Sequence, residues 1–164
     1  ASRGRVRDRF HGGRVVTIPP ALAADIIAKH GHTGVGVRMP AARAFGDRVE
    51  VWLPLIVKSK LNQRQHWGVR MRTARVERRA AIMAILALGA TFDGPLRVTL
   101  TKVGGRRMDD DNLAGAFKNV RDGIADGIGR DDGCKSIKWV YDQRPRRRGE
   151  QAGCGVVIER GDGP

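Results

Sequence analysis

Residues 111–125 constrain the fold most, because their apolar side chains recur at the spacing of a helix that is buried along one side. At about 100° per residue, the apolar positions fall on a single stripe, formed by Leu113, Ala116, Phe117, Val120 and Ile124. The opposite face spans about 60° and is polar or small, with Asp111, Gly115, Lys118 and Asp122. Such an amphipathic helix has to pack its apolar stripe against other elements of a core.

Four segments have the composition and alternation of β-strands. They are "RVEVWLPLIVKSK" from Arg48, "LRVTLTKV" from Leu96, "KSIKWVYDQ" from Lys135 and "GCGVVIER" from Gly153. We expect the last two to form an antiparallel hairpin around the turn "RPRRRGEQ". A second helix is predicted from about residue 74 to 88, with Thr73 as its N-cap. The pattern predicts an α+β fold, a small mixed β-sheet of about four strands packed with two main helices.

A length of 164 residues predicts one main domain. Residues 1–47 differ from the rest, with a basic start, the apolar stretch "RVVTI", and a helix-like segment between Pro20 and Gly31. We assign them as an N-terminal extension of unknown role, either a strand and helix added to the domain or a loosely held arm. Residues 48–164 form the predicted main domain.

The charge balance favours a polyanionic partner. Lys and Arg number 31 against 17 Asp and Glu, a net charge of +14, which indicates nucleic acid, although a solubilising basic surface is the alternative. No apolar run approaches the about 18 residues of a membrane span, and the basic start lacks the hydrophobic segment of a secretion signal. We therefore expect a cytoplasmic protein without membrane contact. Cys134 and Cys154 lack the spacing of a zinc site and are expected as free thiols on strands.

Acidic residues gather at both ends of the predicted helix 111–125. Asp109, Asp110 and Asp111 precede it, Asp131 and Asp132 follow it, and either Asp109 or Asp110 can be its N-cap. A cap needs only one acid, and the others repel one another unless a cation lies between them. Oxygen ligands suit Mg²⁺ or Mn²⁺. The cluster thus predicts a divalent metal site, with redundant capping as the alternative.

The motifs "RRMDDDNL", a lysine on the following helix and "DDG" before a strand resemble the RusA family of Holliday junction resolvases, whose hallmark is D-x-D-N-L with a later D-D. The upstream "SKLNQRQHW" resembles the family's substrate loop, so the likeness covers about residues 48 to 160. It implies a RusA-like fold and a homodimer. It also implies Mg²⁺-dependent hydrolysis of four-way DNA junctions in recombination and repair, by a crossover junction endodeoxyribonuclease encoded by a bacterium or a phage.

Carried over by motif, the resemblance implies that Asp109, Asp111 and Asp132 are catalytic metal ligands, with Asp131 as an alternative to Asp132. The family's lysine position holds Gly115 here. Lys118 is the expected catalytic substitute, and the competing interpretation is an i,i+4 ion pair between Lys118 and Asp122.

Basic and aromatic residues on either side of the acidic motif are expected to bind DNA. They are Lys58, Lys60, Asn62, Arg64, Trp67, Arg70, Arg72, Arg106 and Arg107. We expect Trp67 to be packed rather than inserted between bases. We expect His66 to be structural or solvent-facing, with contact to the substrate as the alternative. Arg144 and residues 146–148 either extend this track or form a solvated turn. Two rival functions stay open: a junction-binding protein without cleavage, suggested by Gly115, and a nuclease acting on other branched DNA.

Overall fold

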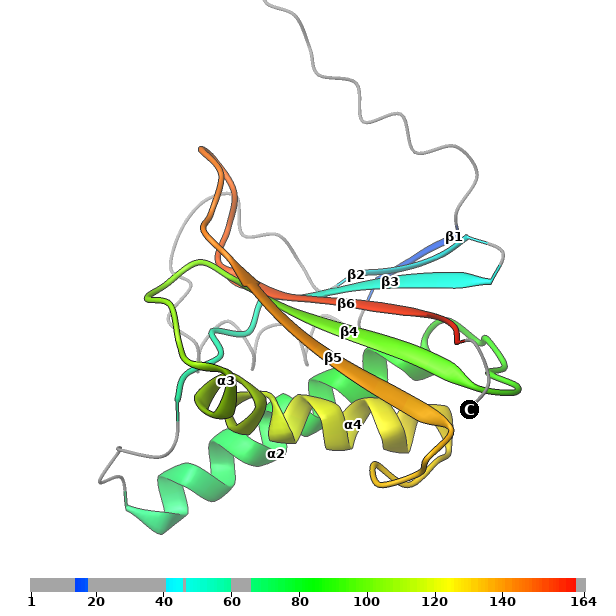
Figure 1. Cartoon of the computed structure of the whole chain (residues 1–164), viewed down its shortest axis with the longest axis horizontal. Helices are drawn as coiled ribbons and strands as arrows, with labels where there is room; N and C mark the ends of the chain where they lie inside the picture. The colour runs from blue at the N-terminus through cyan, green and yellow to red at the C-terminus, as the bar shows by residue number, and fades with distance from the viewer. Residues whose placement is uncertain (1–13, 18–40, 46, 60–65, 162–164) are drawn as a thin grey trace, which may run out of the picture.

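The computed structural model describes residues 14–17, 41–45, 47–59 and 66–161 of the chain (Figure 1). In chain order the elements are β1 (Arg14–Thr17), β2 (Ala41–Phe45), β3 (Arg48–Leu53), α2 (Trp67–Leu86), β4 (Leu96–Val103), α3 (Asp110–Ala116), α4 (Lys118–Ile128), β5 (Ile137–Arg144) and β6 (Gly153–Arg160).

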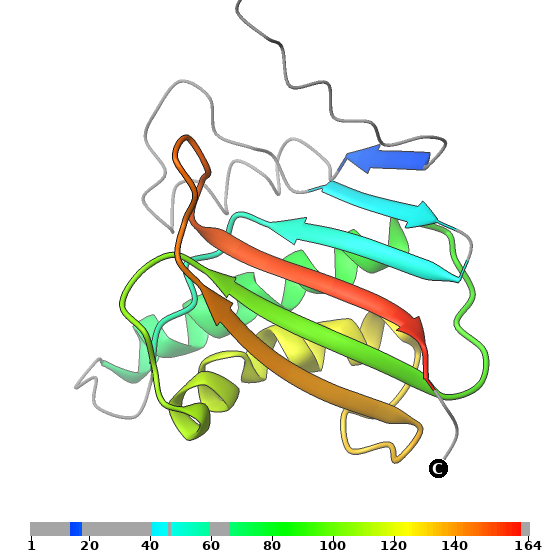
Figure 2. The same ribbon diagram turned by 45° about the horizontal axis from the view of Figure 1, so that its top comes forward.

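The described strands form one six-stranded sheet in the order β1-β2-β3-β6-β4-β5. Strands β4 and β5 are parallel and the other neighbours are antiparallel, so the sheet is mixed. The helices lie together on one face of the sheet (Figures 1 and 2). The α+β prediction is confirmed: the four predicted strands correspond to β3 to β6. Strands β1 and β2 continue the sheet beyond β3.

The predicted hairpin between the last two strands is wrong. β6 lies between β3 and β4, whereas β5 pairs with the other side of β4, with Ile137 opposite Leu96. The chain between β4 and β5 crosses over through α3 and α4, and a helical crossover of this length joins parallel strands. Burial agrees with this order, because Val156 and Ile158 of the inner strand β6 are almost fully buried, whereas most of the edge strand β5 is partly exposed.

Helix α2 begins seven residues before its predicted start at residue 74. The His66 ring is its N-cap, since Nδ1 accepts a hydrogen bond from the Gly68 N–H at 3.3 Å. Thr73, the predicted cap, lies inside the helix and its hydroxyl donates to the Val69 carbonyl at 3.0 Å. A histidine nitrogen replaces the hydroxyl that capping preferences would select.

The predicted helix 111–125 is present in two parts, α3 and α4, that meet at Phe117. Phe117 has φ −82° and ψ −5°, so its backbone departs from ideal helical geometry. Backbone hydrogen bonds from Phe117 to Leu113 and from Arg121 to Phe117 nevertheless continue through the junction. All five residues of the predicted apolar stripe are buried, and Asp109 is the N-cap. The periodicity therefore predicted the buried face correctly and missed the local distortion.

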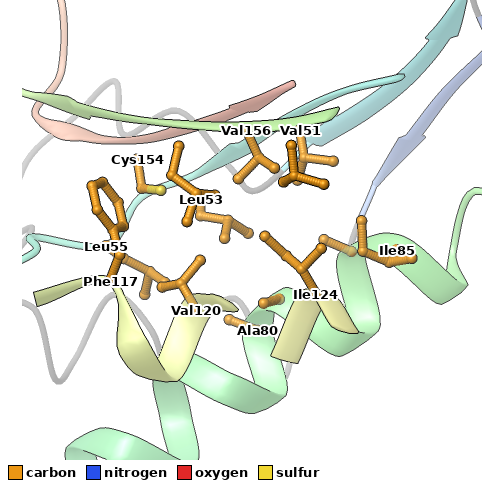
Figure 3. Close-up of a cluster of buried hydrophobic side chains, with 14 of the residues drawn as sticks. Val51, Leu53, Leu55, Ala80, Ile85, Phe117, Val120, Ile124, Cys154 and Val156 are labelled. Atoms are coloured by element: carbon orange, nitrogen blue, oxygen red, sulfur yellow. The ribbon is translucent and has the colours of Figure 1, made fainter. Parts of the chain in front are cut away.

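The core lies between the sheet and the helices (Figure 3). Leu53 and Val156 from the sheet pack over Val120 and Ile124 of α4. Helices α2 and α4 approach so closely that a Cβ added at Gly123 would clash with the backbone carbonyl oxygen of Arg78. A glycine is therefore required at this helix crossing.

Both cysteines are free, as predicted. Cys154 lies on β6 and is fully buried, and this burial raises the pKa of its thiol. Cys134 precedes β5 and is not on a strand, which corrects that part of the prediction. Within the described parts of the chain, no helix has the length and apolar character needed to cross a membrane.

Candidate functional site

A pocket of about 810 Å³ opens where the end of β4, the coil after β3 and the start of α3 come together. Five of its lining residues are cationic: Lys58, Lys102, Arg106, Arg107 and Arg146. The polar residues Ser59, Asp109 and Asn112 also line it. Asp109, the first acid of the D-x-D-N-L motif, thus lines a pocket whose other charged residues are all cationic.

Lys102 is a pocket residue that the sequence analysis missed. It is only 5% exposed, and its Nζ donates to the carbonyls of Gly104 at 2.8 Å and Arg106 at 2.7 Å. Burial lowers the pKa of this ammonium group. The strand alternation contained a signal for it, because Leu96, Val98 and Leu100 point inward and position 102 continues the same face. Lys102 therefore shapes the loop that presents Arg106 and Arg107 to solvent.

The residue before the acidic motif is fixed to the edge strand. The Gln143 side chain of β5 accepts a hydrogen bond from the Met108 N–H at 2.9 Å and donates to the Met108 carbonyl at 2.6 Å. The side-chain amide of Gln143 thus satisfies both backbone groups of Met108, as a neighbouring strand residue would do in a β-sheet. Together with Lys102, Gln143 fixes both ends of the loop 104–108.

Asp109 is held as a charged N-cap. Its Oδ1 accepts from the Asn112 N–H at 2.9 Å and its Oδ2 accepts from Asn112 Nδ2 at 2.8 Å. These two hydrogen bonds, the backbone one first, lower the pKa of the Asp109 carboxyl. Asn112 in turn accepts a hydrogen bond from Ser59 Oγ at 2.6 Å, which connects the coil after β3 to the first turn of α3. The Asp109 carboxylate is thus oriented by neutral partners and not by a cation.

Asp132 follows the C-terminal end of α4, whereas Asp109 and Asp111 lie at the start of α3. Asp132 Oδ2 is 2.6 Å from Arg121 Nη2, and the Asp132 carbonyl accepts a hydrogen bond from Trp139 Nε1 at 3.0 Å. Asp131 accepts from the Gly133 N–H in a local turn.

The three acids predicted as metal ligands do not form one group. In the part of the chain that the structure describes, no three His, Cys, Asp or Glu side chains lie grouped so that they could hold a metal ion. The carboxylates of Asp109 and Asp132 are engaged by Asn112 and Arg121. This arrangement does not fit an assembled metal site, and the Mg²⁺ assignment stays a prediction.

Lys118 forms the i,i+4 ion pair that its spacing predicted. Its Nζ lies 3.3 Å from Asp122 Oδ2, the side chain is mostly exposed, and it is absent from the lining of the pocket beside Asp109. A role for Lys118 at a reacting phosphate stays a prediction. Its neighbour Arg121 donates to Asp132 and, at 3.4 Å, to the Tyr141 hydroxyl, so both of these cations of α4 have partners within the protein.

The predicted DNA-binding residues other than Trp67 divide into three sets. Lys58, Arg106 and Arg107 line the pocket and are exposed. Arg70 and Arg72 are exposed on the first turns of α2. Lys60, Asn62 and Arg64 lie outside the described residues. DNA binding by all of these residues stays a prediction.

The expectation that Trp67 is packed is wrong. Trp67 is 72% exposed, and Val69 and Met71 on the same turns are also exposed. The reason is that α2 starts well before it reaches the core, since its first buried residue is Val76. The early turns of α2 extend away from the sheet (Figure 1).

Arg144 differs from the arginines that follow it. It forms two hydrogen bonds with the Glu150 carboxylate, at 2.7 and 2.6 Å, and these lower the pKa of Glu150 to about 2. Arg144 therefore braces the β5–β6 turn, and its contribution to a DNA track stays a prediction. Residues 146–148 are exposed.

No family model matches this chain. No curated protein matches it either. Among solved structures, the protein Atu1372 of Agrobacterium tumefaciens, whose function is unknown, is similar at 12% identity and a TM-score of 0.39, covering 86% of this chain and 96% of that one. A protein of Shewanella oneidensis MR-1, described as a proposed endoribonuclease, is similar at 10% identity and a TM-score of 0.37, covering 84% and 98%. Both likenesses are too distant to support conclusions about function.

Proposed function

We propose that this chain is a Mg²⁺-dependent, structure-specific endonuclease that resolves four-way DNA junctions, as its resemblance to the RusA family implies. The observation that most supports the proposal is the pocket in which exposed cationic side chains surround Asp109. Arg106 and Arg107 precede the acidic motif, so a phosphate bound by them lies beside Asp109, the first of the acids that the resemblance implies as catalytic. A basic surface without adjacent acids would support binding alone.

The cationic side chains provide the DNA contacts in this proposal. Lys58, Arg106 and Arg107 bind the sugar-phosphate backbone without regard to sequence, and the binding weakens as salt concentration rises. Lys102 and Gln143 fix the loop that holds these arginines. The exposed Trp67 offers an aromatic face on which an unpaired base at a branch can stack.

Two features of the proposal rest on chemistry and symmetry. Mg²⁺ is proposed because the motif supplies hard oxygen ligands, although the carboxylates of Asp109 and Asp132 are engaged by Asn112 and Arg121 in this arrangement. A homodimer is proposed because a four-way junction has paired strands to cut, and a two-fold dimer presents two equivalent sites.

A second candidate is a junction-binding protein of the same fold without cleavage. It is favoured by the separation of the acidic residues, by Gly115 at the lysine position of the motif, and by the pairing of Lys118 with Asp122. It requires the same cationic pocket and differs only in chemistry.

The deciding experiment incubates the purified chain with labelled four-way, flap and linear DNA, with Mg²⁺ and with EDTA. The proposal predicts that only the four-way junction is cut, only with Mg²⁺, to give ligatable 5′-phosphate and 3′-hydroxyl ends. Tight binding without cutting supports the second candidate, and preferred cutting of the flap supports a nuclease for other branched DNA. Failure to bind any of the three excludes both functions.

A further inference from the structure

A second pocket, of about 580 Å³, lies beside the first one and is formed by the turn between β5 and β6. Its lining consists of Gly104, Gly105 and residues 145–151. Gly104, Gly105 and Arg146 line both pockets. The two pockets are therefore adjacent, and Gly104 and Gly105 form a shared floor between them.

This floor requires glycine. Gly104 has φ +87°, and a Cβ added to it would lie 2.6 Å from Cγ of Arg146, whose stem crosses this position. Gly105 follows with φ +74°. Because a side chain at position 104 would collide with Arg146, position 104 has to be glycine, and no side chain separates the two pockets there.

The turn has a fixed shape and an excess of positive charge. Glu150 accepts hydrogen bonds from Arg144 and from the Arg147 N–H, and the Glu150 N–H donates to the Arg147 carbonyl. The segment "RPRRRGEQ" contains four arginines and one glutamate, a net charge of +3. Since Glu150 neutralises Arg144, this charge belongs to Arg146, Arg147 and Arg148. The structure records no hydrogen bond or ion pair for the side chains of these three described residues.

We propose that the two pockets form one groove for a single DNA strand, with the β5–β6 turn as a second phosphate subsite that holds the strand after it passes Asp109. Arg106 and Arg107 bind one phosphate, and Arg147 and Arg148 bind a phosphate further along the same strand. A chain of phosphates fits this groove better than a single small anion, because both pockets are open and their guanidinium groups are spread along both. The choice of DNA as the occupant rests on the proposed function, whereas the groove itself rests on the two pockets.

The test measures binding of fluorescent single-stranded DNA of two lengths, a trinucleotide and a 15-mer, as a function of salt. The variant is Arg147→Ala with Arg148→Ala, which keeps the Arg147 N–H bond to Glu150. The matched control is Arg97→Ala with Lys138→Ala, which removes two exposed charges from paired positions on β4 and β5 that line neither pocket.

The groove predicts that the turn variant loses affinity for the 15-mer and that its salt slope falls by about 0.7, the value for one phosphate contact on a single strand. Affinity for the trinucleotide stays unchanged, and the control matches the unmodified chain for both lengths. An equal loss in the turn variant and the control, or an equal loss at both lengths, overturns the groove. Tighter binding of a matched RNA 15-mer overturns DNA as the occupant.

Junction cleavage is measured on the same samples. If the unmodified chain does not cut, but the turn variant loses affinity for the 15-mer and not for the trinucleotide, the nuclease proposal is refuted and the groove proposal is retained. Cleavage by the unmodified chain with no effect of the turn variant on binding refutes the groove alone. The two failures are therefore distinguishable.

Discussion

Two charged regions of the molecule, the cationic pocket and the surface of α4, differ in whether their cations are paired with carboxylates. Around the pocket, Arg106 and Arg107 are exposed, and the structure records no carboxylate within ion-pair distance of these two described residues. Along α4, Arg121 lies 2.6 Å from Asp132 of the α4–β5 loop, and Lys118 lies 3.3 Å from Asp122. The comparison shows that net charge alone does not locate a polyanion site, since the positions of the carboxylates decide which cations are available to an external ligand.

The two regions also treat their acids differently. Asp109 is satisfied by Asn112 and so leaves the neighbouring guanidinium groups unneutralised. Asp132 is satisfied by Arg121 and neutralises it. An amide partner for Asp109 and an arginine partner for Asp132 therefore leave one region whose arginines have no carboxylate partner and one region whose cations are paired with carboxylates.

Removing the pocket cations should have the largest effect on binding. Arg106→Ala with Arg107→Ala is expected to cost roughly 3 kcal/mol of junction affinity, because two charge-assisted hydrogen bonds to phosphate are lost. The slope of log K against log salt concentration should fall by about 0.9, the value for one phosphate contact on duplex DNA. Titration of a labelled junction by fluorescence anisotropy measures both, and an unchanged slope would show that these arginines do not contact phosphate.

Lys102→Met tests whether the pocket depends on its buried lysine. Methionine preserves the apolar stem but leaves the carbonyls of Gly104 and Arg106 without their donor, at an expected cost of about 2 kcal/mol in unfolding free energy. Urea unfolding measures this loss, with the exposed Lys138→Met as the control. Unchanged stability would mean that solvent or another group replaces Lys102 at these carbonyls.

Arg121→Ala tests the region of α4 in which the cations are paired with carboxylates. We expect a loss of about 1 to 2 kcal/mol in unfolding free energy, because Asp132 and Tyr141 lose a partly buried partner. Junction affinity should change little, since Arg121 already has an internal partner. A loss of affinity comparable to that of the Arg106 and Arg107 variant would abolish the distinction between the two regions.

The smallest expected effect is a pH dependence at the β5–β6 turn. The pKa of Glu150 is lowered from 4.5 to about 2, so its ion pair with Arg144 stabilises the fold fully above pH 4.5 and is lost as the pH falls through 2. Glu150→Gln removes this contribution, which we expect to be about 1 kcal/mol because the pair is partly exposed. The difference in urea unfolding between the two proteins should shrink between pH 5 and 2; a constant difference would contradict the ion pair.

Local sequence patterns predicted which helices and strands form better than they predicted which strands pair with each other. The stripe Leu113 to Ile124 is buried as predicted, because helical periodicity depends only on nearby residues. The pairing of β5 was predicted wrongly, because strand composition does not determine which strand lies alongside. Helix α2 starts earlier than predicted, because its cap is a histidine ring and its first turns contact no core.

The candidate site was predictable only in part. The acidic motif and Arg106 and Arg107 were visible in the sequence, and they line or adjoin the pocket. Lys102 was missed because a lysine is expected to be exposed, although strand alternation places it inward. The pairing of Asp132 with Arg121 depends on how the chain returns from α4 to β5, which no local pattern determines.

The most direct test of the central claim, that the acids beside the cationic pocket cut the DNA it binds, compares Asp111→Asn with Asp126→Asn. Asp126 is an exposed acid on α4 that pairs with Arg78 outside the motif, so the two substitutions match in chemistry. In single-turnover assays on a four-way junction with Mg²⁺, we predict that Asp111→Asn loses cleavage and retains junction affinity, while Asp126→Asn cuts normally. Undiminished cutting by Asp111→Asn would contradict the account.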